Sequence, residues 1–179
     1  MKKIIACDID DVLFRLVPLW IDKYNFIWDD NLDHKTITDW DISLFVKPKC
    51  GEKIYSYLDE KLYLDKNLVK NADWGVKQLR KMGYRVIFIT SNSFNMGGVK
   101  FEWLNRNGFE VDKKDYFECG EKSLVKFNLL LDDNYSNVFS SGKRGVLFTQ
   151  SWKMKNNHPR RVSSWKEFIK HMKENKYGL

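Results

Sequence analysis

The chain has 179 residues, of which 43% are hydrophobic and 15% aromatic, and this composition excludes a disordered or low-complexity protein. A chain of this length buries roughly 70% of its unfolded surface, which is enough for one core. The formal charge of +7 could indicate nucleic-acid binding, but the basic residues are spread along the chain, and the densest group, at 153–161, contains Pro159. We therefore expect an anion-binding surface for small phosphorylated substrates, and no nucleic-acid partner.

The three cysteines, Cys7, Cys50 and Cys119, are odd in number and lack C-x-x-C spacing, so neither a disulfide framework nor a zinc site is expected. No stretch approaches the roughly 20 apolar residues that a membrane helix needs. The apolar run that follows Met1, Lys2 and Lys3 is too short for a signal peptide. We expect a cytoplasmic protein with no membrane partner, and a homodimer remains open.

The first predicted strand covers about residues 3–8, an apolar run that ends in Asp8, Asp10 and Asp11. In open α/β sheets, ligands bind just outside the carboxyl ends of the strands. Crowded carboxylates repel one another unless a cation offsets the repulsion, and Mg2+ prefers oxygen ligands. Taken alone, the motif fits either a metal site or a solvated acidic turn.

Residues 14–70 carry helical patterns at 16–28 and 53–58, joined by an irregular segment at 29–49. We interpret 14–70 as a helical cap inserted after the first strand. The catalytic core is then expected to consist of residues 1–13 and 71–179.

The rest of the chain alternates between helices and strands. The predicted helices are 72–82, 99–107 and a last one opened by Ser164 and Glu167 in capping-box spacing, and the predicted strands are 84–90, 116–118, 127–131 and 145–148. This alternation predicts an α/β fold with a parallel sheet and helices on both faces.

Two further strand ends carry polar groups. The strand at 84–90 ends in Thr90 and Ser91, followed by Asn92, and hydroxyl groups with free backbone N–H groups suit phosphate oxygens. The strand at 127–131 runs into Asp132 and Asp133, which could form a four-oxygen metal site beside the first strand end. Ten residues before this pair, Lys122 supplies a positive charge.

These four elements, in this order, resemble the haloacid dehalogenase (HAD) superfamily of phosphotransferases: a D-x-D-x-V strand end, a Ser/Thr strand end, a lysine and an acidic pair. The longer pattern is similar to the 5'(3')-deoxyribonucleotidase branch and covers nearly the whole chain. It comprises residues 8–13, 37–41, 89–92, 122–125, 129–133, 147–152, 161–162 and 165. One departure is Ser151, which stands before Trp152 where family members often carry proline.

The resemblance implies a Rossmann-like HAD core and Mg2+-dependent hydrolysis of (deoxy)ribonucleoside 5'-monophosphates through an aspartyl-phosphate. Asp8 would be the nucleophile and Asp10 the general acid and base. Asp8, the backbone carbonyl of Asp10 and an acid of the Asp132–Asp133 pair would hold Mg2+, and which member of the pair is the direct ligand stays open.

By the same resemblance, Thr90, Ser91 and Lys122 would hold the phosphate oxygens. Trp40 and Tyr63 match aromatic positions that would stack on the base, although most aromatic side chains in such a domain serve packing. The preferred base and sugar, and the position of the phosphate, stay open.

Two alternatives remain. The protein could be an HAD phosphatase for another small phosphate ester, or a non-catalytic module that binds nucleotides. A non-catalytic module should have lost a catalytic residue, yet Asp8, Asp10, Lys122 and Asp132 are all present.

Overall fold

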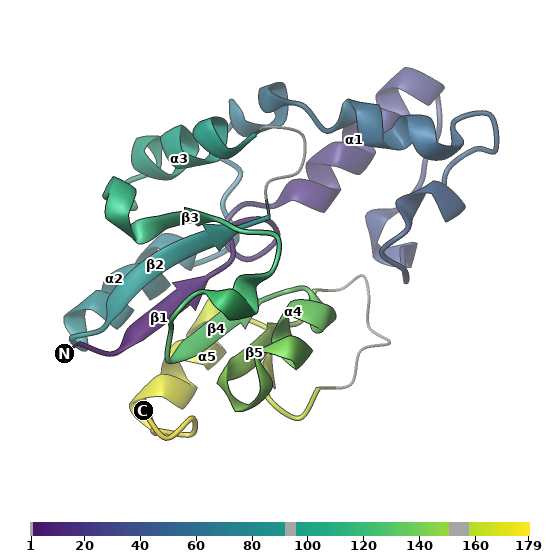
Figure 1. Cartoon of the computed structure of the whole chain (residues 1–179). Coiled ribbons are helices and arrows are strands. Elements are labelled where there is room, and N and C mark those ends of the chain that lie inside the picture. The colour runs from purple at the N-terminus through teal and green to yellow at the C-terminus, as the bar shows by residue number, and fades with distance from the viewer. Residues whose placement is uncertain (1, 92–95, 151–157) are drawn as a thin grey trace.

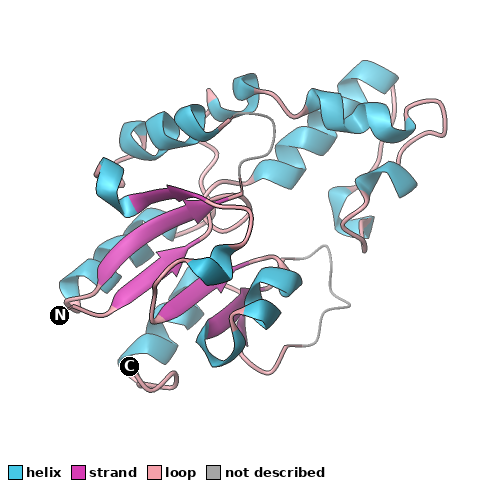
Figure 2. Ribbon diagram, in the orientation of Figure 1, coloured by secondary structure: helices cyan, strands magenta, loops and turns pink. Residues whose placement is uncertain are grey.

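A six-stranded parallel sheet forms the centre of the molecule, with strand order β3-β2-β1-β4-β5-β6 (Figures 1 and 2). The computed structural model describes residues 2–91, 96–150 and 158–179. The strands are β1 (Ile4–Cys7), β2 (Arg85–Thr90), β3 (Tyr116–Glu118), β4 (Leu129–Asp132), β5 (Gly145–Phe148) and β6 (Arg161–Val162). The predicted α/β class with a parallel sheet is confirmed. The two-residue β6 was not expected as a strand.

Some residues of the sequence motifs lie outside the described part of the chain. They are Asn92, the Ser151–Trp152 departure and residues 153–157 of the basic group.

In the described part of the chain, five α-helices accompany the strands: α1 (Leu16–Trp28), α2 (Ala72–Lys81), α3 (Gly97–Arg106), α4 (Tyr135–Ser140) and α5 (Trp165–Lys173). The Ser164 cap expected at the start of α5 is present, since the Ser164 side chain accepts a hydrogen bond from the Glu167 backbone N–H, but the Glu167 carboxylate accepts its backbone hydrogen bond from Ser163 and not from Ser164 as in a full capping box. The short α4 was not predicted. It begins at Asn134, whose side chain accepts hydrogen bonds from two backbone N–H groups of the first turn.

Alternate residues of the strands belong to two hydrophobic clusters, one on each face of the sheet. Ile5 and Cys7 join the larger cluster, to which α2 and α5 contribute, and Ala6 joins the smaller one. Gly145, on the face of the smaller cluster, packs so closely on α4 that a Cβ would lie 2.3 Å from the Val138 carbonyl oxygen. Helices therefore cover both faces, as predicted (Figure 1).

The packing of α2 against α5 also fixes the loop that follows β1. A Cβ at Gly75 of α2 would lie 2.1 Å from the Trp165 ring, so only glycine permits this approach. The buried Trp165 indole donates a hydrogen bond to the Val12 carbonyl at 2.8 Å. The acidic loop is thereby tied to the helix layer beneath it.

Between β1 and α2 the chain leaves the sheet and forms a separate layer beyond the carboxyl ends of the strands (Figure 1). This layer contains α1 and the 3-10 helices η1 (His34–Thr36), η2 (Ile42–Leu44), η3 (Gly51–Tyr57) and η4 (Glu60–Tyr63). The helix expected at 53–58 is thus a 3-10 helix.

The inserted segment enters and leaves the core at one place. Phe14 and Leu68 form an antiparallel bridge, and the Arg15 backbone N–H donates to the Asn67 carbonyl at 3.0 Å. Within the described ranges, none of the helices has the length and apolar character required to cross a membrane.

Candidate active site

The loop after β1 presents the three acids in different directions. The Asp8 backbone N–H donates to the Leu131 carbonyl at 2.9 Å, so β4 holds the nucleophile candidate in place. Asp11 adopts a left-handed conformation with φ of 55°, which turns the chain sharply. The Asp11 carboxylate accepts a hydrogen bond from the Val17 backbone N–H at 3.2 Å, near the start of α1. The third acid of the motif therefore contacts the inserted helix.

Asp8, Asp132 and Asp133 form an acidic cluster whose potential ligand oxygens lie within 4.8 Å of one another. The carboxyl ends of β1 and β4 are adjacent in the sheet, which brings the two acidic strand ends together. Asn137 donates to Asp132 Oδ2 at 3.1 Å and fixes that carboxylate. An all-oxygen set of this kind fits a hard divalent cation such as Mg2+.

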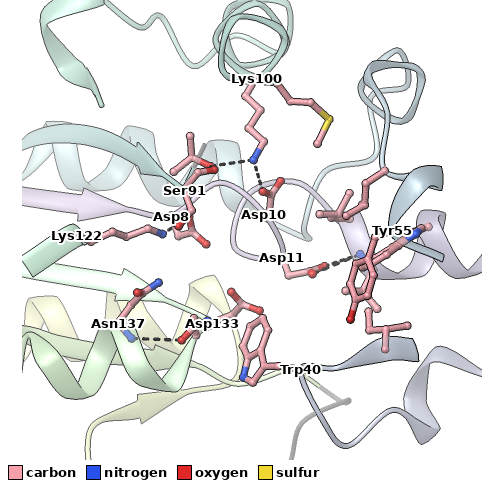
Figure 3. Close-up of a pocket in the computed structure, with 18 residues that line it drawn as sticks. Asp8, Asp10, Asp11, Trp40, Tyr55, Ser91, Lys100, Lys122, Asp133 and Asn137 are labelled. Atoms are coloured by element: carbon pink, nitrogen blue, oxygen red, sulfur yellow. Dashed lines mark hydrogen bonds and ion pairs between the residues drawn. The ribbon is translucent and has the colours of Figure 1, made fainter. Parts of the chain in front are cut away.

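Lys122 bridges two members of this cluster. Its ammonium donates to Asp8 Oδ1 at 2.6 Å (Figure 3) and to Asp132 Oδ2 at 2.8 Å, and its side chain is 2% exposed. Burial alone would lower the pKa of Lys122, but the two carboxylates outweigh burial and raise it. The lysine is therefore a permanent positive charge at the sheet edge.

Burial raises the pKa of Asp8 well above its usual range, and the nearby carboxylates add to this effect, while Lys122 opposes it. The cluster thus holds more negative charge than one lysine balances. A bound cation would favour the ionised form of Asp8.

The Asp10 carboxylate points away from the cluster. It accepts hydrogen bonds from the Tyr63 hydroxyl and from Lys100 Nζ, each at 2.6 Å. Burial, followed by the charge of Asp10, raises the pKa of Tyr63 well above its usual range, so its hydroxyl remains protonated and donates. The Asp10 side chain is not one of the cluster of carboxylates that could hold a metal.

A cavity of about 320 Å³ opens above these groups (Figure 3), a size that accepts a small-molecule ligand. Its polar end contains Asp8, Asp10, Thr90, Ser91, Lys122 and Asp133. Its opposite wall comes from the inserted segment and contains Leu16, Val17, Trp20, Trp40, Ile42 and Leu58. The cavity therefore joins a charged end at the sheet to an apolar wall.

The two aromatic residues proposed for base stacking occupy different environments. Trp40 lines the cavity and is 42% exposed. Tyr63 is fully buried, its ring stacks on Phe14 with centroids 4.5 Å apart, and it does not line the cavity. The prediction that Tyr63 stacks on a base is wrong for this geometry, because no face of its ring is accessible.

Sequence reasoning missed Lys100, which lines the cavity and also donates to Thr90 Oγ1 at 2.9 Å. A signal existed: Lys100 shares a face of α3 with the buried Trp103 and Leu104, three and four residues later. A charged residue on an apolar helix face needs a buried partner.

The family model described as "5' nucleotidase, deoxy (Pyrimidine), cytosolic type C protein" matches residues 2–175 of the chain. The chain belongs to this family. It is therefore an enzyme, a phosphatase with the HAD fold. Curated relatives named 5'(3')-deoxyribonucleotidase occur in Bacillus subtilis, 29% identical over 169 residues (93% of this chain and 96% of the relative), and in Clostridium acetobutylicum, 26% identical over 167 residues (93% and 92%).

Solved structures show the same fold at low identity. An HAD family hydrolase from Deinococcus radiodurans, solved with phosphate and sodium, has a TM-score of 0.61 at 12% identity and covers 99% of this chain and 96% of its own. An HAD hydrolase from Bacillus subtilis, solved with magnesium, has a TM-score of 0.60 at 14% identity, with coverage of 96% and 99%.

Proposed function

We propose that the enzyme hydrolyses deoxyribonucleoside 5'-monophosphates with Mg2+, through an aspartyl-phosphate on Asp8. The observation that carries this proposal is the two-ended cavity, in which the acids and Lys122 face the apolar wall that includes Trp40. A phosphate suits the first end and a nucleoside the second. The names of the curated relatives support the same substrate class.

In the first step, a carboxylate oxygen of Asp8 attacks phosphorus. The bond between phosphorus and the nucleoside oxygen breaks, and its electron pair stays with that oxygen, which receives the proton of Asp10. The products are the free nucleoside and the aspartyl-phosphate.

In the second step, water attacks the same phosphorus and gives a proton to the Asp10 carboxylate. The bond between phosphorus and the Asp8 oxygen breaks, which restores the Asp8 carboxylate and releases inorganic phosphate. Asp10 thus ends the cycle protonated, as it began.

Thr90, Ser91 and Lys122 would bind the non-bridging phosphate oxygens, since all three line the polar end of the cavity. Asp8, Asp132 and Asp133, with the backbone carbonyl of Asp10, would hold Mg2+. When bound, the metal would offset the repulsion between the Asp8 carboxylate and the anionic phosphate. Lys122 shares this task through its contacts with Asp8 and Asp132.

We assign residues 14–70 to a cap and residues 1–13 and 71–179 to the catalytic core. The bridge between Phe14 and Leu68 supports this division, because it lies where the inserted layer leaves the core and where it returns to the core. The cap supplies the apolar wall of the cavity and hence the contacts to the nucleoside.

Phosphate release from a panel of monoesters tests the proposal. The panel contains deoxyribonucleoside and ribonucleoside 5'-monophosphates, 3'-monophosphates, sugar phosphates and p-nitrophenyl phosphate, with Mg2+ present. We expect the highest kcat/KM with a deoxyribonucleoside 5'-monophosphate. A sugar phosphate as best substrate would favour a phosphatase for another small ester, and binding of nucleotide without turnover of any ester would favour a non-catalytic module.

Replacing Trp40 by alanine should remove stacking on the base but no contact with the phosphate. Stacking contributes roughly 1 to 3 kcal/mol, so kcat/KM for a deoxynucleotide should fall about five- to 150-fold. Hydrolysis of p-nitrophenyl phosphate should change by less than about twofold, since this ester lacks a base. Steady-state kinetics on both substrates measures the contrast.

Trp74→Ala is a matched control, because Trp74 is similarly exposed at 37% but lies on α2 and does not line the cavity. Equal proportional losses on both esters with Trp40→Ala, together with a lower Tm, would assign Trp40 to packing of the cap instead.

A further inference from the structure

The Asp10 carboxyl group is held at both of its oxygens by donors from different parts of the fold. The Tyr63 hydroxyl, from the inserted segment, donates to Oδ1 at 2.6 Å. Lys100 Nζ, from α3, donates to Oδ2 at 2.6 Å (Figure 3). The two contacts together fix both the position of the group and the rotation of its plane.

Lys100 is costly to bury, because its side chain is only 3% exposed. A buried ammonium lowers stability unless it is paired, and an apolar side chain of similar size often serves as well for packing. The Lys100 ammonium donates hydrogen bonds to Asp10 Oδ2 and to Thr90 Oγ1, and both of these partners line the cavity. The charge is thus directed at the reacting end of the site.

Tyr63 is equally constrained. Its ring is fully buried and stacked on Phe14, and its backbone carbonyl accepts a hydrogen bond from Arg106 Nη2 at 2.8 Å. Arg106 belongs to α3, as does Lys100. The same helix therefore positions one donor directly and anchors the backbone of the other.

We propose that Lys100 and Tyr63 are positioning residues that hold the Asp10 carboxyl group in line for proton transfer with the nucleoside oxygen and then with water. This inference rests on the proposed function, in which Asp10 is the acid and base. Each carboxyl oxygen has two lone-pair sites, so it can accept one of these hydrogen bonds and still carry the transferred proton. Proton transfer requires the acid within hydrogen-bond reach of its target, which a freely rotating carboxyl group meets only part of the time.

The test compares esters whose leaving groups differ in their need for a proton. A nucleoside or other alkyl oxygen departs as a strongly basic group, whereas p-nitrophenolate departs without protonation. We expect Lys100→Met to lower kcat/KM for a deoxynucleoside 5'-monophosphate by roughly 10²- to 10⁴-fold, the range of general acid catalysis. The same variant should lower kcat/KM for p-nitrophenyl phosphate by less than about tenfold.

Tyr63→Phe keeps the buried ring and removes only the hydroxyl. Its loss on the nucleotide should be smaller, roughly ten- to 100-fold, with the same dependence on the leaving group. If Lys100→Met fails to fold, the Tyr63→Phe variant still tests the positioning role, because loss of the hydroxyl leaves the stacking on Phe14 in place.

A second measurement reports on the second step of the reaction, the hydrolysis of the aspartyl-phosphate. When Asp10 is misplaced, hydrolysis of the aspartyl-phosphate also slows, so stopped-flow mixing with p-nitrophenyl phosphate should show a burst of p-nitrophenolate approaching one per enzyme. A residue that only supports the fold would not produce a burst in the properly folded fraction.

Two control variants remove the same kinds of group away from the cavity, and Lys114, unlike the buried Lys100, is exposed. Lys114→Met removes a lysine paired with Asp112, and Tyr24→Phe removes a buried hydroxyl that donates to Asp30. Neither should show dependence on the leaving group. Proportional losses on both esters for Lys100→Met and Tyr63→Phe, without a burst, would overturn the proposal.

Failure of the proposed function gives a different result. Wild-type enzyme would then release no phosphate from nucleotides while still hydrolysing p-nitrophenyl phosphate. In that case β-glycerophosphate replaces the nucleotide as the alkyl ester, and the same contrast tests the positioning role.

Discussion

Asp8→Asn should lower phosphate release by more than about a thousandfold, because it removes the attacking oxygen charge while preserving the volume of the side chain. Loss of a covalent nucleophile costs roughly 10⁶ in kcat in a serine protease, and the second step here cannot begin without the first. Steady-state assays with a deoxynucleotide and with p-nitrophenyl phosphate measure the loss. Both esters should be affected equally, unlike the variants at Lys100 and Tyr63.

The fold should survive this substitution. Burial raises the pKa of Asp8, which means that its ionised form costs stability at neutral pH in the absence of metal, and a neutral asparagine removes that cost. Lys122 keeps its contact with Asp132. The Tm of metal-free Asp8→Asn should therefore equal or exceed that of wild type.

The exposed Asp112, which pairs with Lys114, provides a control, and Asp112→Asn should retain full activity. Residual activity of Asp8→Asn above about one hundredth of wild type would remove Asp8 from the nucleophile role.

Chelation of the metal should lower activity about as much as Asp8→Asn does. EDTA should abolish activity and Mg2+ should restore it, because the cluster of Asp8, Asp132 and Asp133 concentrates negative charge where an anionic phosphate must bind. Ca2+ should support turnover poorly, since it is larger and accepts a looser arrangement of ligands. Activity assays across the three conditions provide the first measurement.

Thermal melting provides a second measurement that does not depend on turnover. A cation that binds only the folded state at about 100 times its Kd adds roughly 2.7 kcal/mol, which corresponds to an increase in Tm of roughly 5 to 11 °C for a chain of this size. Asp133→Asn, which leaves the contacts of Asp132 unchanged, should reduce this increase if Asp133 is a direct ligand. Full activity in EDTA with no change in Tm on addition of Mg2+ would contradict the metal-assisted mechanism.

The sequence by itself determined the parallel sheet and its reactive edge. Buried parallel strands appear as short, continuous apolar runs, and the polar residues after each run must meet at one edge because the strands are parallel. This is why the acidic cluster and Thr90 were predicted together. Helix α1, with bounds Leu16–Trp28, coincides with its predicted range because its pattern is long and apolar.

Local sequence patterns predicted the elements less well where the fold is irregular. The inserted segment forms several 3-10 helices, which lack the periodicity of a long helix, and β6 has only two residues. The order of the strands in the sheet could not be predicted from these runs either, since a run of apolar residues does not specify which strand pairs with it.

Only the tertiary structure decided the surroundings of Asp10. Lys100 lies 90 residues from it in the sequence and Tyr63 lies 53 residues away, on a helix and on the inserted segment respectively. Residue type and periodicity can place Lys100 on a buried face and can mark Tyr63 as an aromatic side chain near the cavity. They cannot say which buried groups meet, because that depends on how α3 and the inserted segment pack over the end of the sheet. The same packing separates Trp40, which lines the cavity, from Tyr63, whose ring belongs to the core.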